Sequence, residues 1–157
     1  MDKIKAVALD IDGVLTDGNF YWGSNGEELK KFSFSDVMGV SLGQKAGLIF
    51  ALISGESNTL IDRFAEKMGI VDIYKGSKDK AAALCSFSQK YDLELSQICF
   101  MGDDVNDLRA LALAGLSVAP ANAHDIVKQM VKLITKNSGG QGAVRELVDL
   151  ILTNNCE

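Results

Sequence analysis

The chain has 157 residues and a formal net charge of −5, and 47% of its residues are hydrophobic. This length predicts one domain, residues 1–157, with room for a sizeable core. The acidic balance and the lack of a basic block argue against nucleic-acid binding, and no apolar run reaches the length of a membrane span. The three cysteines have neither zinc-site nor disulfide spacing, and the chain begins without a leader pattern, so we expect a reduced, cytoplasmic protein.

Apolar runs and helical spacing divide the chain into alternating strands and helices. Uninterrupted apolar runs predict buried strands over residues 4–10, 48–53, 71–74, 98–101 and 116–119. Helical periodicity and capping residues predict helices over residues 36–46, 58–68, 79–91, 104–114, 123–134 and 143–152. This alternation predicts an α/β protein in which helices cover both faces of a parallel, Rossmann-like sheet.

Two segments lie outside this alternation. Asn25-Gly26 is a strong hairpin signal between two extended arms, and it predicts a β-hairpin flap over about residues 18–34. Gly139 and Gly140 belong to a short glycine-rich stretch, which predicts a flexible connector and a flexible C-terminal tail from about residue 138. We find no boundary that would separate a second domain.

Polar side chains collect where the predicted strands end. Asp10 and Asp12 follow the first strand one residue apart, so their side chains emerge on the same side of an extended backbone. Ser54 follows the second strand, Asp103 follows the fourth, and Lys80 lies in the first turn of a helix. Because the carboxyl ends of parallel strands share one edge of a sheet, we expect a single site there. Carboxylates for Mg²⁺, a hydroxyl and a lysine suit a phosphate group.

At this point the chain resembles the haloacid dehalogenase superfamily of phosphotransferases, whose members share four motifs. The first, Asp-x-Asp-Gly-x-x-Thr/Val, is matched by residues 10–16, and the second, a Ser or Thr after a hydrophobic strand, by Ser54. The third is a lysine, matched by Lys80, and the fourth, Gly-Asp-x-x-x-Asp, is matched by residues 102–107. All four occur in order, and the resemblance covers nearly the whole chain.

The resemblance implies a role for each motif residue. Asp10 would attack phosphorus and form an aspartyl-phosphate, and Asp12 would protonate the leaving oxygen and then activate water. The Asp10 side chain, the backbone carbonyl of Asp12 and Asp103 would hold Mg²⁺. Ser54 and Lys80 would bind the transferring phosphoryl group.

The resemblance also implies supporting roles around these residues. Asp107 and Asn106 would orient the lysine or the phosphate, and Gly55 would belong to the substrate-binding loop. Asp104 would support the metal ligands from behind, or only cap a helix.

Many members of the superfamily carry a cap domain after the first motif or between the second and third. Here residues 12–54 hold only the hairpin and one helix, and residues 54–80 hold a helix and a short strand, so we expect no cap domain. The chain therefore resembles the capless branch, in which the hairpin builds a homotetramer and neighbouring subunits close the site. Arg145 could be a ligand supplied to a neighbour, or an ordinary surface arginine.

The capless branch hydrolyses phosphate esters of 2-keto-3-deoxy sugar acids, which implies a small sugar phosphate as the substrate here. Its eight-carbon enzymes usually place an arginine directly after the Ser/Thr-Gly pair, where this chain has Glu56. Glu56 could pair with Lys67, which would face the substrate carboxylate, or it could only cap the next helix. We therefore expect the nine-carbon ester, 2-keto-3-deoxy-nononate (KDN) 9-phosphate, with 3-deoxy-manno-octulosonate (KDO) 8-phosphate as the alternative. Ser33 and Asp36 could also touch the substrate.

Two other functions use a similar set of residues. A phosphomutase also needs two aspartates such as Asp10 and Asp12, but mutases usually need a cap domain that excludes water. A phosphoacceptor signalling domain of the receiver type also combines acids, a hydroxyl and a lysine in a small α/β domain. Its acceptor aspartate stands on the third strand and its lysine is followed by proline, whereas Lys80 is followed by Ala81. A sugar phosphate phosphatase is therefore the leading hypothesis.

Overall fold

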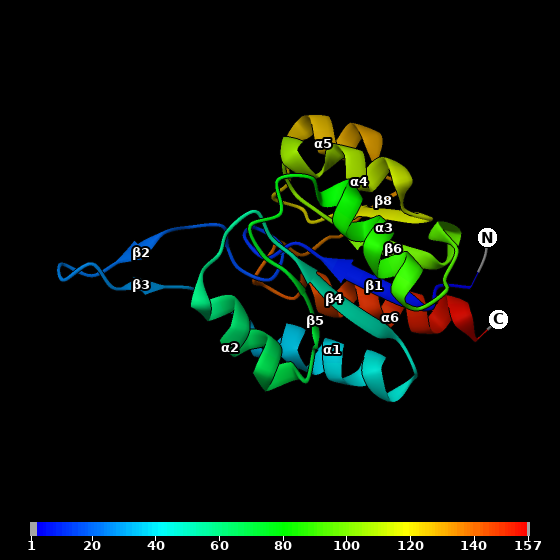
Figure 1. The fold of residues 1–157 in the computed structure, drawn as a ribbon, viewed down its shortest axis with the longest axis horizontal. Helices are drawn as coiled ribbons and strands as arrows, with labels where there is room; N and C mark the ends of the chain where they lie inside the picture. Colours follow the sequence, from blue (N-terminus) through cyan, green and yellow to red (C-terminus); the bar gives the residue numbers. More distant parts are fainter. Residues whose placement is uncertain (1–2, 157) are drawn as a thin grey trace.

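The computed structural model describes residues 3–156. The expectation that the chain begins without a leader concerns a segment whose first two residues lie outside the described part. The structure contains a six-stranded parallel sheet (Figure 1). Its strands are β1 (Ala6–Leu9), β4 (Ile49–Ile53), β5 (Asp72–Tyr74), β6 (Ile98–Met101), β7 (Leu116–Ala119) and β8 (Leu133–Ile134). They lie in the order β5-β4-β1-β6-β7-β8. The strand that leads into the first motif, β1, is therefore central, with the strands of the second and fourth motifs on either side.

Helices cover both faces of this sheet. α1 (Phe34–Lys45), α2 (Thr59–Met68) and α6 (Ala143–Asn155) pack on one face, and α3 (Lys80–Lys90), α4 (Leu108–Leu113) and α5 (Asp125–Met130) on the other (Figure 1). Because successive strand residues point to opposite faces, Val7 and Leu9 enter the first core layer while Ala6 and Ala8 enter the second. The predicted α/β fold is confirmed. None of the helices within residues 3–156 is long and apolar enough to cross a lipid bilayer.

The predicted hairpin forms and projects from the body of the molecule as β2 (Tyr21–Trp22) and β3 (Glu28–Leu29) (Figure 1). Between Asp12 and Ser54 the chain holds only this hairpin, α1 and β4, and between Ser54 and Lys80 only α2 and β5. Neither insertion point carries a cap domain, as expected. The assignment of the whole chain to a single domain stays a prediction.

The predicted helix over residues 123–134 ends early. α5 stops at Met130, and the chain then forms the edge strand β8, which pairs in parallel with β7. The backbone N–H of Thr135 donates to the Ala119 carbonyl at 2.9 Å. A strand of two residues is too short to show a periodic pattern in the sequence. β8 is defined by its hydrogen bonds to β7, which only the tertiary structure shows. The predicted helix over residues 104–114 likewise begins as a 3₁₀ turn, Val105–Asp107.

The glycine-rich stretch is part of the packed interior, which corrects the expected flexible connector. Gly139 and Gly140 are buried, and a Cβ added to Gly139 would lie 1.9 Å from the Gly13 carbonyl oxygen. Asn122 bridges the two segments, because its Nδ2 donates to the Gly13 carbonyl at 3.0 Å and its Oδ1 accepts from the Gly139 N–H at 2.7 Å. Glycine is required here by this close approach. The stretch therefore supports the first-motif loop, and the expected flexible tail forms α6 instead.

Asp36 also has a structural role that differs from the expected substrate contact. It is fully buried in the first turn of α1, and its carboxylate accepts from the backbone N–H groups of Gly142 at 3.4 Å and Arg145 at 3.0 Å. These N–H groups lie at the start of α6, where a helix has no internal acceptors for them. Gly39 lets the two helices approach, since an added Cβ would lie 2.8 Å from the Arg145 Cα. Asp36 therefore fastens α6 to α1.

Candidate active site

The motif side chains converge on one pocket at the carboxyl edge of the sheet. The pocket has a volume of about 400 Å³ and is lined by Asp10, Asp12, Gly18, Ser54, Gly55, Glu56, Lys80, Asp103, Asp104 and Asn106. Open α/β sheets bind their ligands at this edge, outside the carboxyl ends of the strands. The four motifs, which are far apart in the sequence, therefore form a single site.

Lys80 lies buried between two carboxylates. Its Nζ is 3.0 Å from Asp10 Oδ1 and 2.7 Å from Asp107 Oδ1. Burial lowers the pKa of Lys80, but the charges of Asp10 and Asp107 outweigh burial and raise this pKa above its ordinary value. Asp79 caps α3 by accepting from the Ala82 N–H at 3.2 Å, and this cap places Lys80 in the first turn at the sheet edge. The site thus holds a permanent ammonium beside Asp10.

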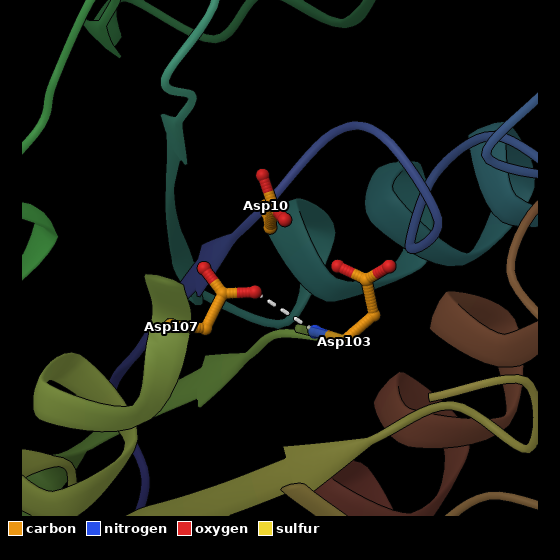
Figure 2. Close-up of side chains that lie close together, drawn as sticks. All are labelled: Asp10, Asp103 and Asp107. Atoms are coloured by element: carbon orange, nitrogen blue, oxygen red, sulfur yellow. Dashed lines mark hydrogen bonds between the residues drawn. The ribbon is translucent and has the colours of Figure 1, made fainter. Parts of the chain in front are cut away.

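Three carboxylates, those of Asp10, Asp103 and Asp107, lie close together at this edge of the sheet (Figure 2). Oxygens of Asp10, Asp103 and Asp107 lie within 4.8 Å of one another. Burial, together with the charge of Asp107, raises the pKa of Asp10 well above its ordinary value, and burial raises the pKa of Asp103 to about 6. Closely spaced acids whose ionised forms are disfavoured fit a hard divalent cation such as Mg²⁺, which takes oxygen ligands.

The oxygens of Asp107 are already used by the protein. Its Oδ1 contacts Lys80, and its Oδ2 accepts from the backbone N–H groups of Asp103 at 2.9 Å and Asp104 at 3.3 Å (Figure 2). Asp10 and Asp103 are therefore the side chains of this cluster that are better placed to offer an oxygen to a metal, and their role as ligands stays a prediction. Asp107 is better placed to orient the lysine and the fourth-motif loop.

The first-motif loop depends on Gly13. This residue has φ +84°, and a Cβ there would lie 2.0 Å from Asp103 Oδ2. The loop can therefore pass directly over the fourth motif only with glycine at this position. Before the loop, the Asp10 N–H donates to the Met101 carbonyl at 3.0 Å, and Asp10 Oδ1 accepts from the Ile11 N–H at 2.8 Å. These two hydrogen bonds orient the Asp10 carboxylate at the end of β1.

Asp12 has a partner that the sequence analysis missed. Its Oδ1 lies 2.5 Å from Nζ of Lys30, a residue of the returning hairpin arm. The Lys30 side chain is only 4% exposed, whereas that of Asp12 is 36% exposed toward the pocket. Lys30 belongs to none of the four motifs. The sequence predicts the hairpin, but it does not tell which side chains of the hairpin arms face the pocket.

The second-motif loop also lies in the pocket. Ser54 is 1% exposed, and its Oγ accepts from the Glu56 N–H at 3.1 Å. Gly55 and Glu56 follow it along the pocket wall. From the fourth motif, Asp104 and Asn106 are exposed and line the pocket, and Asp104 also caps the 3₁₀ turn by accepting from Val105. Asp104 therefore caps the turn, and its support of the metal ligands stays a prediction.

Other predicted site residues lie outside this pocket. Ser33 is the N-cap residue of α1, and Lys67 is exposed in the last turn of α2. Arg145 lies on α6, where its Nε is 2.9 Å from a carboxylate oxygen of Asp149. Within one chain the structure therefore does not bring Lys67 to Glu56, and a role of Arg145 at a neighbour's site stays a prediction.

The chain matches known proteins over most of its length. The family model of haloacid dehalogenase-like hydrolases matches residues 19–147. The 3-deoxy-D-manno-octulosonate 8-phosphate phosphatase of Escherichia coli (strain K12) is 36% identical over 151 residues, which cover 96% of this chain and 80% of that relative. The corresponding enzyme of Yersinia pestis is 37% identical over 150 residues, with the same coverage.

Solved structures agree with these matches. That of 3-deoxy-D-manno-octulosonate 8-phosphate phosphatase from Moraxella catarrhalis, in complex with a magnesium ion, a phosphate ion and a KDO molecule, is 38% identical with a TM-score of 0.93, covering 96% of this chain and 87% of that one. The cobalt-bound Haemophilus influenzae enzyme is 34% identical with a TM-score of 0.94, covering 98% and 90%. The motifs, the fold and these matches together show that the chain belongs to the haloacid dehalogenase-like hydrolases and is a phosphatase of that family.

Proposed function

We propose that this chain is a Mg²⁺-dependent phosphatase that passes the phosphoryl group of a sugar phosphate to Asp10 and then to water. The observation that carries this proposal is the pocket, in which a nucleophile, an acid–base group and a buried ammonium face one space. The Asp10 carboxylate has two oxygens, so one would attack phosphorus while the other contacts the metal.

The proposed reaction has two displacements at phosphorus. A carboxylate oxygen of Asp10 bonds to phosphorus while the bond to the ester oxygen breaks, and Asp12 gives its proton to that oxygen. Asp12 then takes a proton from water, whose oxygen displaces Asp10 and releases inorganic phosphate. Lys80 and the Ser54 hydroxyl bind the phosphoryl oxygens throughout. When bound, Mg²⁺ on Asp10, Asp103 and the Asp12 carbonyl offsets the negative charge of the phosphate.

The relatives support an eight-carbon sugar acid as the substrate. The Escherichia coli and Yersinia pestis relatives, which match 96% of this chain, are named as phosphatases of 3-deoxy-D-manno-octulosonate 8-phosphate, and the Moraxella structure holds KDO itself. A pocket of about 400 Å³ with mainly polar residues suits a compact sugar acid phosphate. KDO 8-phosphate therefore takes the place of the nine-carbon ester as the leading candidate.

One observation still favours the nine-carbon ester, KDN 9-phosphate. Glu56 lines the pocket at the position where the resemblance implies arginine in eight-carbon enzymes, and its carboxylate would repel the acid group of a substrate placed there. The second part of this hypothesis, the pairing of Glu56 with Lys67, finds no support within one chain, since Lys67 is exposed in the last turn of α2. The case for the nine-carbon ester therefore depends on Glu56.

Reversing the charge at position 56 is expected to shift the choice between these substrates. Glu56→Arg should raise kcat/KM for the eight-carbon ester relative to the nine-carbon ester by about tenfold, which corresponds to about 1.4 kcal/mol. Initial rates of phosphate release with both esters would measure this ratio. Glu66→Arg is the matched control, since Glu66 is exposed on α2 outside the pocket. An unchanged ratio would show that position 56 does not read the sugar acid, and a wild type that prefers the nine-carbon ester would reverse our choice.

We also propose that the chain forms a homotetramer through its hairpin. Phe20, Trp22 and Leu29 are 66%, 72% and 61% exposed on the projecting arms, where Leu29 pairs with Tyr21 and therefore lies on the other face of the hairpin from Trp22. The rings of Phe20 and Trp22 contact each other, with centroids 5.3 Å apart. Large apolar side chains exposed on both faces of a projecting hairpin favour a protein interface there. Neighbouring subunits would then stand close enough to the pocket to complete it.

Trp22→Glu is expected to dissociate this assembly, because a charge would be buried at the centre of the apolar contact. Light scattering at the assay concentration should give four times the chain mass of 16.9 kDa for the wild type and a smaller mass for the variant. Leu150→Glu, on the exposed side of α6, controls for the change of charge. A wild-type monomer with full activity would refute the shared site.

The compartment stays a prediction. Cys85, Cys99 and Cys156 are free thiols, and Cys99 is buried. Free thiols are typical of reducing compartments, so we propose that the enzyme acts in the cytoplasm.

A further inference from the structure

The side chain of Lys30 is buried, and this lysine belongs to none of the four motifs. Its side chain is 4% exposed, and lysine is almost never buried to this extent without a partner. Within the described part of the chain, the acid that pairs with it is Asp12, at 2.5 Å. We propose that Lys30 is a positioning residue that holds the Asp12 carboxylate in place for acid–base catalysis. This inference rests on the function proposed above for Asp12.

The arm that carries this lysine is fastened to the body of the molecule on both sides of it. Before the lysine, the Glu28 carboxylate accepts from Asn58 Nδ2 at 2.5 Å, at the start of α2. After it, Phe32 stacks on Phe64 with ring centroids 4.6 Å apart, and also forms a β-bridge with Thr16 of the first-motif loop. These anchors come from the same chain. The position of the ammonium is therefore set by the fold of one subunit, and it does not depend on contacts at the hairpin tip.

Lys30 reaches the pocket only through Asp12. Asp12 lines the pocket and is 36% exposed, whereas Lys30 does not belong to the lining residues found in the described chain. The ammonium occupies Asp12 Oδ1, which leaves Oδ2 to meet the ester oxygen or the water. Without this contact, a half-exposed aspartate is free to rotate, and Lys80 offers a competing ammonium in the same pocket. Lys30 therefore acts on the orientation of the acid rather than on the substrate.

The contact between Lys30 and Asp12 should affect the catalytic rate through the orientation of the Asp12 carboxylate. A general acid must lie within hydrogen-bond reach of the oxygen that it protonates. Misplacing a reacting group by about 1 Å can cost about 10²-fold in rate. A residue that only positions Asp12 should therefore change kcat and leave substrate affinity nearly unaltered, because it makes no contact with the substrate.

The test compares Lys30→Met with Lys31→Met. Methionine keeps the apolar stem and removes the ammonium, and Lys31 is the exposed neighbour on the same arm, so the net charge change is identical. With saturating Mg²⁺ and the sugar phosphate, Lys30→Met should lower kcat by about 10- to 100-fold and change KM by less than about threefold. Lys31→Met should match the wild type. Lys30→Arg keeps a positive charge in the arm and should recover part of the loss.

A second measurement separates positioning from loss of structure. In single-turnover experiments, formation of the aspartyl-phosphate from the sugar phosphate should be slowed in Lys30→Met and, less, in Lys30→Arg. Formation from p-nitrophenyl phosphate should be nearly unaffected, because nitrophenolate leaves without a proton. A distorted site would slow both substrates equally, which would overturn the proposal.

Two kinetic outcomes would also overturn it. Equal rates in Lys30→Met and Lys31→Met would show that the contact has no catalytic effect, and a raised KM with unchanged kcat would make Lys30 a substrate ligand. If the wild type releases no phosphate from any sugar phosphate, the proposed function itself fails. An inactive wild type would therefore count against the proposed function, whereas an active wild type whose rate Lys30→Met does not change would count against the role of Lys30.

Discussion

Replacing Asp10 by asparagine is expected to abolish phosphate release, with kcat lowered by about 10⁴-fold or more. The amide is a poor nucleophile, and it removes one of the two carboxylates that are better placed to offer an oxygen to Mg²⁺. Phosphate release with saturating sugar phosphate measures the loss, and acid quenching of the wild type during turnover should trap phosphate on the protein. The variant should carry none.

The fold should survive this substitution. Burial raises the pKa of Asp10 well above its ordinary value, so the ionised group is disfavoured in the folded state and a neutral isostere removes that cost. Lys80 keeps Asp107 as its partner at 2.7 Å. We expect the variant to have an unchanged or higher Tm. Asp62→Asn is the control and should stay active, because Asp62 lies on α2 and pairs with Lys75 on the surface. A well-folded Asp10→Asn protein with wild-type turnover would disprove the mechanism.

Removal of the divalent cation is expected to lower turnover to the background rate, and added Mg²⁺ should restore it. Oxygens of Asp10, Asp103 and Asp107 lie within 4.8 Å, so without a cation they repel both one another and a phosphate ester. Exhaustive chelation followed by Mg²⁺ titration measures the effect. Asp103→Asn should need more Mg²⁺ for half-maximal activity than the wild type. Undiminished turnover after complete metal removal would rule out the metal assignment.

The same site predicts how Mg²⁺ binding depends on pH. The pKa of Asp103 is raised to about 6, so below this pH the carboxyl is mostly protonated and Mg²⁺ must displace a proton to bind. Apparent Mg²⁺ affinity should therefore fall as the pH decreases through about 6. Calorimetric titrations at several pH values would show this, and Asp103→Asn should flatten the dependence.

The sequence alone determined the family, the α/β fold and the residues of the pocket. Asp10, Asp12, Ser54 and Asp103 follow apolar strands directly, and Lys80 follows a capping aspartate, so each position depends on its immediate neighbours. Parallel strands then carry their carboxyl ends to one edge, which joins these local signals into a site. The lack of a cap domain could likewise be read from the short spacings between motifs.

Only the tertiary structure decided which other residues support that site. Asp36 caps α6 across a sequence separation of 109 residues, and Asn122 reaches Gly13 across the same separation. Gly139 is needed for close packing, although a glycine-rich stretch reads as flexible. Lys30 meets Asp12 because α2 and the first-motif loop anchor its arm. These partners are chosen by packing between distant segments, and packing leaves no periodic or local pattern in the sequence.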